Sequence, residues 1–136
     1  MQHRLKVVFD TNIYISAIVF GGAPLLCLEA ARSREVELYV SKGILLELTN
    51  KLESKFLHSR TDTEKVLTRL SKFAKIITPK EKLTIIKDDP SDNMILEAAV
   101  EAKTDFIVSG DKKHILSLKE FRGIKIISPA DFLKQF

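Results

Sequence analysis

The sequence predicts an α/β sandwich with a mostly parallel sheet, formed as a single domain by residues 1–136. Short apolar segments rich in β-branched residues alternate along the chain with longer segments whose apolar residues recur at helical spacing. This alternation is typical of a sheet covered by helices. A chain of 136 residues can bury one full hydrophobic core but is too short for two.

Composition agrees with a globular protein of the cytoplasm. Hydrophobic residues make up 45% of the chain and charged residues 29%, which argues against disorder. No apolar segment approaches the roughly 20 residues needed to cross a bilayer, and no signal peptide is visible. The single cysteine, Cys27, fits a reducing compartment. We therefore expect a cytoplasmic protein that does not bind a membrane.

The first half of the chain contains three predicted strands and four predicted helices. Leu5–Phe9 is a short β-type apolar segment, and the helix that follows it should end at Gly21-Gly22. Pro24 fits the first turn of a second helix, and Ser41 is a suitable N-cap for a long amphipathic one. The other expected elements are helices over 24–34 and 61–75, strands over 36–40 and 76–77, and an extended piece over 83–86.

The second half continues the alternation. Pro90 suits the first position of a helix that runs to about Lys103, with Asp89 as its N-cap. Residues 106–108 and 124–127 are expected strands, with a short helix over 115–118 between them. Ser128 and Asp131 resemble a capping box for the last helix.

Three acids fall where strands end or helices begin. Asp10 and Asp111 each follow an apolar strand, and Asp92 stands at the third position of its helix. Such acids often act only as helix caps or favour the helix dipole. The carboxyl ends of parallel strands, however, meet at one edge of the sheet, where ligands bind. Both interpretations of these acids stay open at this point.

Asp92 argues against a purely structural role. Helical spacing puts it on the same face as Ile95 and Ala99, which must pack on the sheet, whereas Glu97 and Glu101 should face solvent. An acid on an inward face is unfavourable unless a cation or hydrogen bonds compensate it.

Charge is distributed unevenly along the chain. The net charge is +4, yet residues 51–87 hold ten basic side chains against four acidic ones, and residues 88–111 hold seven acids against one lysine. A basic region beside an acidic cluster suits a polyanion and a divalent cation, although two solvated helix faces would give the same pattern. Carboxylates are ligands for Mg²⁺ or Mn²⁺, and such ions can promote hydrolysis of a phosphodiester.

The ordered set of motifs resembles the PIN domain family of metal-dependent nucleases, in the branch that includes the toxins of toxin–antitoxin systems. The similarity runs nearly end to end. The matching segments are Val7-Val8-Phe9-Asp10-Thr11-Asn12, Ile44-Leu45-Leu46-Glu47-Leu48, Asp88-Asp89-Pro90-Ser91-Asp92-Asn93, Thr104-Asp105-Phe106-Ile107-Val108-Ser109-Gly110-Asp111 and Ile127-Ser128-Pro129-Ala130-Asp131.

The resemblance implies a three-layer α/β/α fold whose central strand is the first, and an acidic pocket that uses Mg²⁺ or Mn²⁺ to cleave RNA. It also implies homodimers and a protein antitoxin. The family's acids fall on Asp10, Glu47, Asp92 and Asp111, and its supporting polar positions on Asn12 and Ser109. Glu47 enters the set only through the resemblance, because its spacing alone is that of a surface glutamate.

Two positions depart from the family pattern. Asn93 stands where relatives often carry a second acid, and the segment after Asp111 is longer and more basic. Lys112 and Lys113 in that segment are candidate substrate contacts. The four main acids are intact, so the resemblance still implies metal binding.

The leading hypothesis is therefore a Mg²⁺- or Mn²⁺-dependent endoribonuclease, the toxin component of a type II toxin–antitoxin system. Two alternatives stay open: a PIN-fold module that binds RNA or an antitoxin with little catalysis, and an RNA-processing nuclease outside any toxin–antitoxin system. Asn12 argues against a haloacid dehalogenase phosphatase, which needs an acid two residues after its nucleophile. Gly21-Gly22 does not make the glycine-rich turn of a dinucleotide-binding fold.

Overall fold

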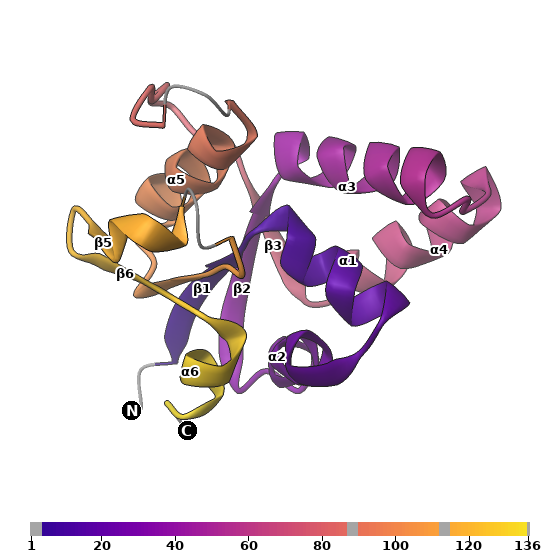
Figure 1. The fold of residues 1–136 in the computed structure, drawn as a ribbon, viewed down its shortest axis with the longest axis horizontal. Helices are drawn as coiled ribbons and strands as arrows, with labels where there is room; N and C mark the ends of the chain where they lie inside the picture. The colour runs from indigo at the N-terminus through magenta and orange to yellow at the C-terminus, as the bar shows by residue number, and fades with distance from the viewer. Residues whose placement is uncertain (1–3, 87–89, 112–114, 136) are drawn as a thin grey trace.

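The computed structural model describes residues 4–86, 90–111 and 115–135. Six strands form one sheet, and helices pack around it (Figure 1). The strands are β1 (Leu5–Phe9), β2 (Val36–Ser41), β3 (Ala74–Ile77), β4 (Phe106–Val108), β5 (Glu120–Phe121) and β6 (Ile124–Ile127). The helices are α1 (Thr11–Val19), α2 (Gly22–Arg32), α3 (Lys42–Lys55), α4 (Arg60–Ser71), α5 (Pro90–Ala102) and α6 (Pro129–Leu133), with the 3₁₀ turn η1 (Leu116–Leu118).

The strand order is β3-β2-β1-β4-β6-β5, and every pairing is parallel except that of β5 with β6. Figure 1 shows the sheet between α5 on one side and α1 and α2 on the other. The predicted α/β/α sandwich and its mostly parallel sheet are confirmed. The first strand lies inside the sheet, as the resemblance implied.

β1 is buried at its carboxyl-terminal end. Val7, Val8 and Phe9 are fully buried, because helices cover both faces of the sheet. The register pairs Phe9 with Val108 of β4, and the next backbone N–H, that of Asp10, donates to the carbonyl of Val108 at 2.9 Å. The residues that follow β1 and β4 therefore emerge side by side at the carboxyl edge of the sheet.

Three element predictions differ from the structure. The helix expected over 61–75 ends at Ser71, because Ala74–Ile77 pairs with β2 as a strand. The segment 83–86 forms no strand. A hairpin that was not predicted joins β5 to β6 through Arg122 (φ 50°) and Gly123 (φ 82°), a pair of left-handed residues of the kind that tight hairpins use.

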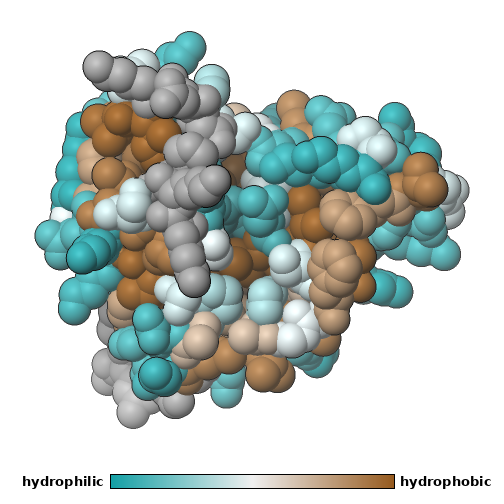
Figure 2. All heavy atoms as spheres, in the orientation of Figure 1, coloured by the Kyte–Doolittle hydropathy of each residue, from teal (hydrophilic) through white to brown (hydrophobic). Residues whose placement is uncertain are grey.

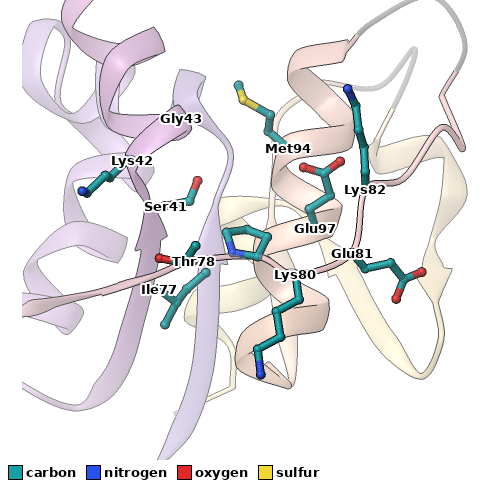
Figure 3. A pocket seen from close by; sticks show the side chains of 11 residues that line it. Ser41, Lys42, Gly43, Ile77, Thr78, Lys80, Glu81, Lys82, Met94 and Glu97 are labelled. Carbon is teal, nitrogen blue, oxygen red and sulfur yellow. The ribbon is translucent and has the colours of Figure 1, made fainter.

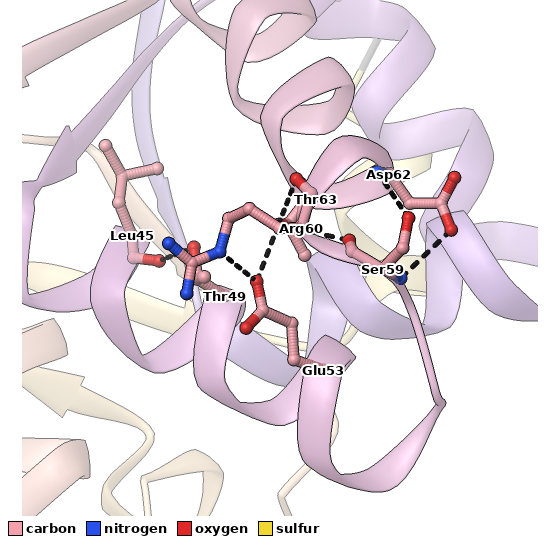
Figure 4. A network of polar contacts seen from close by, with 7 residues as sticks. All are labelled: Leu45, Thr49, Glu53, Ser59, Arg60, Asp62 and Thr63. Carbon is pink, nitrogen blue, oxygen red and sulfur yellow. Dashed lines mark hydrogen bonds and ion pairs between the residues drawn. The ribbon is translucent and has the colours of Figure 1, made fainter.

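The junction of α3 and α4 is held by polar contacts around Glu53 (Figure 4). The Glu53 carboxylate accepts from the buried Thr63 hydroxyl at 2.7 Å and from Arg60 Nε at 3.1 Å. The Thr63 hydrogen bond is the largest cause that lowers the pKa of Glu53. Ser59 and Asp62 form a reciprocal capping box at the start of α4. Glu53 is therefore a structural residue.

Three side chains of α5 fasten the segment between β3 and α5. Glu101 accepts from the backbone N–H of Lys80 at 3.0 Å, and Glu97 from that of Leu83 at 2.8 Å. Asn93 bonds both backbone groups of Ile86, accepting at 3.0 Å and donating at 2.7 Å. Because these residues are spaced by four along α5, they share one face of the helix. Glu97 and Glu101 are partly exposed, so the expectation that they face solvent holds only in part, because the segment covers some of that face.

Within the described residues, no single helix is long and apolar enough to cross a membrane. α1 and α2 together have sufficient length and apolar composition, but the two helices are bent by 104° relative to each other. Figure 2 shows apolar side chains at the surface near the ends of α1 and α3. Phe20 and Leu57 are 75% and 88% exposed there, and the Phe20 ring lies edge-on to Phe56.

Candidate active site at the carboxyl end of the sheet

Asp10 is the centre of the polar cluster at this edge. Its side chain is 4% exposed, and its Oδ1 accepts from the backbone N–H of Asn12 at 3.2 Å, which caps α1. Its Oδ2 accepts from the fully buried Ser109 hydroxyl at 2.8 Å. Asp10 therefore caps α1 through one carboxylate oxygen, while Ser109 holds the other at the end of β4; its role as a metal ligand stays a prediction.

Ser109 connects Asp10 to Asp111. Its Oγ donates to Asp10 and accepts from the backbone N–H of Asp111 at 3.0 Å. The parallel register of β1 and β4 brings these residues together, as the two strand ends predicted. Asp111 is close enough that its charge contributes to a raised pKa of Asp10.

Burial is the main cause of the raised pKa of Asp10, because a buried site disfavours the charged carboxylate. The hydrogen bonds from Ser109 and the Asn12 backbone lower the pKa, and the negative charge of Asp111 raises it. The positive charge of Lys51 lowers it. Asp10 thus lies in a desolvated, negative environment that a bound cation would stabilise.

Glu47 lies on α3 and faces this cluster through Lys51. Its side chain is only 15% exposed, and Oε1 lies 3.5 Å from Lys51 Nζ. The same Nζ lies 3.5 Å from Asn12 Oδ1 at the start of α1. The structure therefore separates Glu47 from Glu53, which periodicity could not: Glu53 binds α4, whereas Glu47 is linked to the residues around Asp10.

Asp92 is buried, at 5% exposure, in the first turn of α5. α5 packs against β1, β2 and β4, so the inward position predicted from helical spacing is confirmed. Among the residues that the structure describes, no three acidic, histidine or cysteine side chains converge closely enough to hold a metal ion. The donor set suits a hard cation, but Glu47 is engaged by Lys51. Lys112 and Lys113 lie outside the described residues.

Other acids of the 88–111 segment serve elsewhere. Asp105 precedes β4 and accepts from the backbone N–H of Lys6 at 2.8 Å, at the opposite edge of the sheet. Glu97 and Glu101 fasten the segment before α5. Of the seven acids in residues 88–111, at least these three therefore do not belong to the candidate site.

Two hollows lie near this edge of the sheet. One, of about 450 Å³, is lined by Asn12 and Asp111 together with Ile13, Ser16, Pro24, Gly110 and Pro129. The other, of about 340 Å³, lies between the start of α3, the end of β3 and α5 (Figure 3). We call this second hollow the lysine groove, because Lys42, Lys80 and Lys82 line it.

The lysine groove carries excess positive charge. Glu81 is paired with Arg122 through two hydrogen bonds of 2.8 and 2.9 Å, and Glu97 accepts from the Leu83 backbone. Its three lysines form no ion pair within the described part of the chain. In Figure 3, Lys42 stands on the α3 side and Lys80 and Lys82 on the side of the segment after β3.

Close packing of α3 against α5 shapes this groove. A Cβ on Gly43 would lie 2.8 Å from Met94 Sδ, so only glycine allows this approach without moving Met94. Gly43 stands one turn before Glu47, and Met94 two residues after Asp92. The groove therefore adjoins the elements that carry two of the candidate acids.

The fold is an α/β/α sandwich whose mostly parallel sheet carries Asp10 and Asp111, linked through Ser109, at its carboxyl edge. A PIN domain family model matches residues 6–113. The chain belongs to the PIN domain family. PIN domains are generally nucleases, and they usually use divalent metal ions.

A relative and several solved structures are similar to the chain. The uncharacterized protein MJ1680 of Methanocaldococcus jannaschii is 30% identical over 146 residues, covering 98% of this chain and 92% of the relative. VapBC2 from Rickettsia felis, bound to a promoter DNA fragment, matches with a TM-score of 0.65, 18% identity, and coverage of 91% and 98% of the two chains. FitAcB from Neisseria gonorrhoeae matches with a TM-score of 0.57, 13% identity, and coverage of 91% and 98%. At these identities, the two structures show a shared fold.

Proposed function

We propose that the protein, as one PIN domain over residues 1–136, is a Mg²⁺- or Mn²⁺-dependent endoribonuclease. The observation that carries the proposal is the buried Asp10, whose pKa is raised by desolvation and by Asp111 and whose oxygens are held by Ser109 and Asn12. A desolvated carboxylate beside a second acid is a favourable ligand environment for a hard cation.

In this proposal, Asp10, Glu47, Asp92 and Asp111 hold the ion. The bound ion would activate water and stabilise charge on the phosphodiester. Ser109 keeps the Asp10 carboxylate in one orientation, and Asn12 lies where its amide can orient a ligand or a phosphate oxygen. Rigid support of this kind is what metal ligands commonly receive from neighbouring side chains.

RNA is the proposed substrate because the acids adjoin a groove of excess positive charge. Lys42, Lys80 and Lys82 would contact phosphates on one side of the scissile bond, while the hollow beside Asn12 and Asp111 leaves room on the other. Lysines and arginines of the basic region 51–87 are further candidates for holding the RNA backbone, but Arg60 pairs with Glu53 and Lys75 with Glu37.

We also propose that the protein is the toxin of a toxin–antitoxin pair and that it forms a homodimer in the cytoplasm. The sequence resemblance and the structural neighbours VapBC2 and FitAcB support the pairing. The exposed apolar side chains Phe20 and Leu57 support a protein contact, since such surface residues often mark interfaces.

The test is cleavage of defined single-stranded and structured RNAs by the purified protein with Mg²⁺, Mn²⁺ or EDTA. The proposal expects internal cleavage with either metal ion and none with EDTA. RNA binding that persists in EDTA, with no cleavage under any divalent ion, would instead support the module with little catalysis.

A further inference from the structure

Lys51 is the basic residue closest to the candidate acids for which sequence reasoning gave no individual role. It follows Glu47 by four residues on α3, a spacing that brings side chains together on a helix. Its Nζ lies 3.5 Å from Glu47 Oε1 and 3.5 Å from Asn12 Oδ1. The Lys51 ammonium thus bridges α3 to the start of α1, two residues from Asp10.

The Lys51 ammonium places a positive charge beside Glu47 and Asp10, as a bound metal ion would. The Lys51 charge acts on Asp10 against the combined effect of burial and of Asp111. The Lys51 side chain is 29% exposed and that of Glu47 15%, so the pair is partly shielded from solvent and its attraction is less screened than that of a surface pair.

A divalent ion that uses Glu47 needs a carboxylate oxygen that Lys51 now holds. It would also meet the positive charge of Lys51 nearby. Both effects weaken binding of the ion, the first by competition for the ligand and the second by repulsion. Among the described residues, no three acids converge on one point, and Glu47 lies against Lys51. Both observations agree with competition between Lys51 and a metal ion for Glu47.

We infer that Lys51 is a positioning residue that stands in for the cation: it holds Glu47 and Asn12 beside Asp10, and a divalent ion must displace it from Glu47. Lys51 therefore raises the concentration of the divalent ion at which the site is filled. This inference rests on the proposed metal-dependent function.

The experiment measures Mn²⁺ binding by electron paramagnetic resonance, without RNA, for wild type, Lys51→Met and Lys51→Arg. Lys55→Met is the matched control, because Lys55 is an exposed lysine one turn further along the same helix. We expect Lys51→Met to bind Mn²⁺ about tenfold more tightly, in keeping with removal of a unit charge near the ion. Lys51→Arg and Lys55→Met should stay within about twofold of wild type, by the same electrostatic reasoning.

Tighter binding distinguishes this role from a merely structural one, because a damaged site would bind the ion more weakly. Equal affinities of wild type and Lys51→Met, or weaker binding by Lys51→Met, would overturn the inference and leave the proposed function standing. If neither protein binds Mn²⁺, the metal-dependent function falls, and the inference falls with it.

Discussion

At the level of a single residue, Asp10 caps a helix, and we propose that it is also a metal ligand. Its carboxylate caps α1, yet burial and the charge of Asp111 raise its pKa, because both disfavour the charged form. Functional sites often contain groups with shifted pKa values that lower the stability of the folded protein.

The first prediction concerns Asp10→Asn in the absence of metal. Because the pKa of Asp10 is higher in the folded than in the unfolded protein, the folded state binds more protons between the two values, and stability falls as pH rises through that interval. At neutral pH, Asp10→Asn should therefore raise the thermal midpoint by about 2–4 °C.

Thermal unfolding in EDTA at pH 7 and at pH 4 measures this effect. The advantage of Asp10→Asn should shrink toward pH 4, where the wild-type carboxylate takes up a proton. An Asp10→Asn variant that is less stable than wild type at pH 7 would show that hydrogen bonding to Ser109 and Asn12 outweighs desolvation.

At the level of an element, α5 combines two tasks on different faces. Asp92 lies buried at its start, while Asn93, Glu97 and Glu101 fasten the preceding segment. Asn93 differs from the acid that relatives often carry, and its amide explains why: it must both accept from and donate to Ile86.

The second prediction is that Asn93→Asp destabilises the protein by about 1–3 kcal/mol, because the carboxylate cannot donate to the Ile86 carbonyl. Chemical denaturation measures the loss. Asn50→Asp serves as the control, since Asn50 is exposed. The Ser54 hydroxyl donates to its backbone carbonyl, and this bond does not depend on the Asn50 side chain. Equal stabilities of the two variants would contradict the role given to Asn93.

At the level of the whole molecule, the carboxyl edge of the sheet carries acids at its centre and unmatched lysines on one flank. The third prediction is that replacing Lys42, Lys80 and Lys82 together by Gln weakens RNA binding and its salt dependence. Each lost phosphate contact should reduce the slope of log affinity against log salt by about 0.7.

Fluorescence anisotropy with a labelled single-stranded RNA in EDTA gives this slope without cleavage. The control replaces Lys55, Lys65 and Lys72 by Gln, since these exposed lysines lie on α3, on α4 and just after α4, and none of them lines the groove. If both triple variants lose the same slope, the binding is diffuse and the groove has no special part.

Much of this arrangement was predictable because it follows from local patterns. β1, the strand-end acids and the inward face of Asp92 came from periodicity and position, and the structure agrees. The segment 83–86 is held by Glu97 and Asn93 of α5, and no pattern within the segment indicates these contacts.

Contacts between distant segments explain what the sequence did not reveal about the site. Lys51 and Asn12 are 39 residues apart, and Ser109 and Asp10 are 99 apart. The spacing of Glu47 and Lys51 by four is a usable signal, but it is equally typical of an ordinary surface pair. Only the packing of α1 beside α3 shows that this pair adjoins Asp10.

The most direct measurement is single-turnover cleavage of RNA at saturating Mn²⁺ by wild type, Asp10→Asn, Glu47→Gln and Glu53→Gln. We predict that Asp10→Asn and Glu47→Gln lose activity by more than about 100-fold, a loss that even weakening a metal ligand's support can cause. Glu53→Gln should be less stable yet retain near wild-type cleavage, because the Glu53 carboxylate binds Arg60 and Thr63 of α4. Undiminished cleavage by Asp10→Asn would contradict the assignment of this edge as the active site.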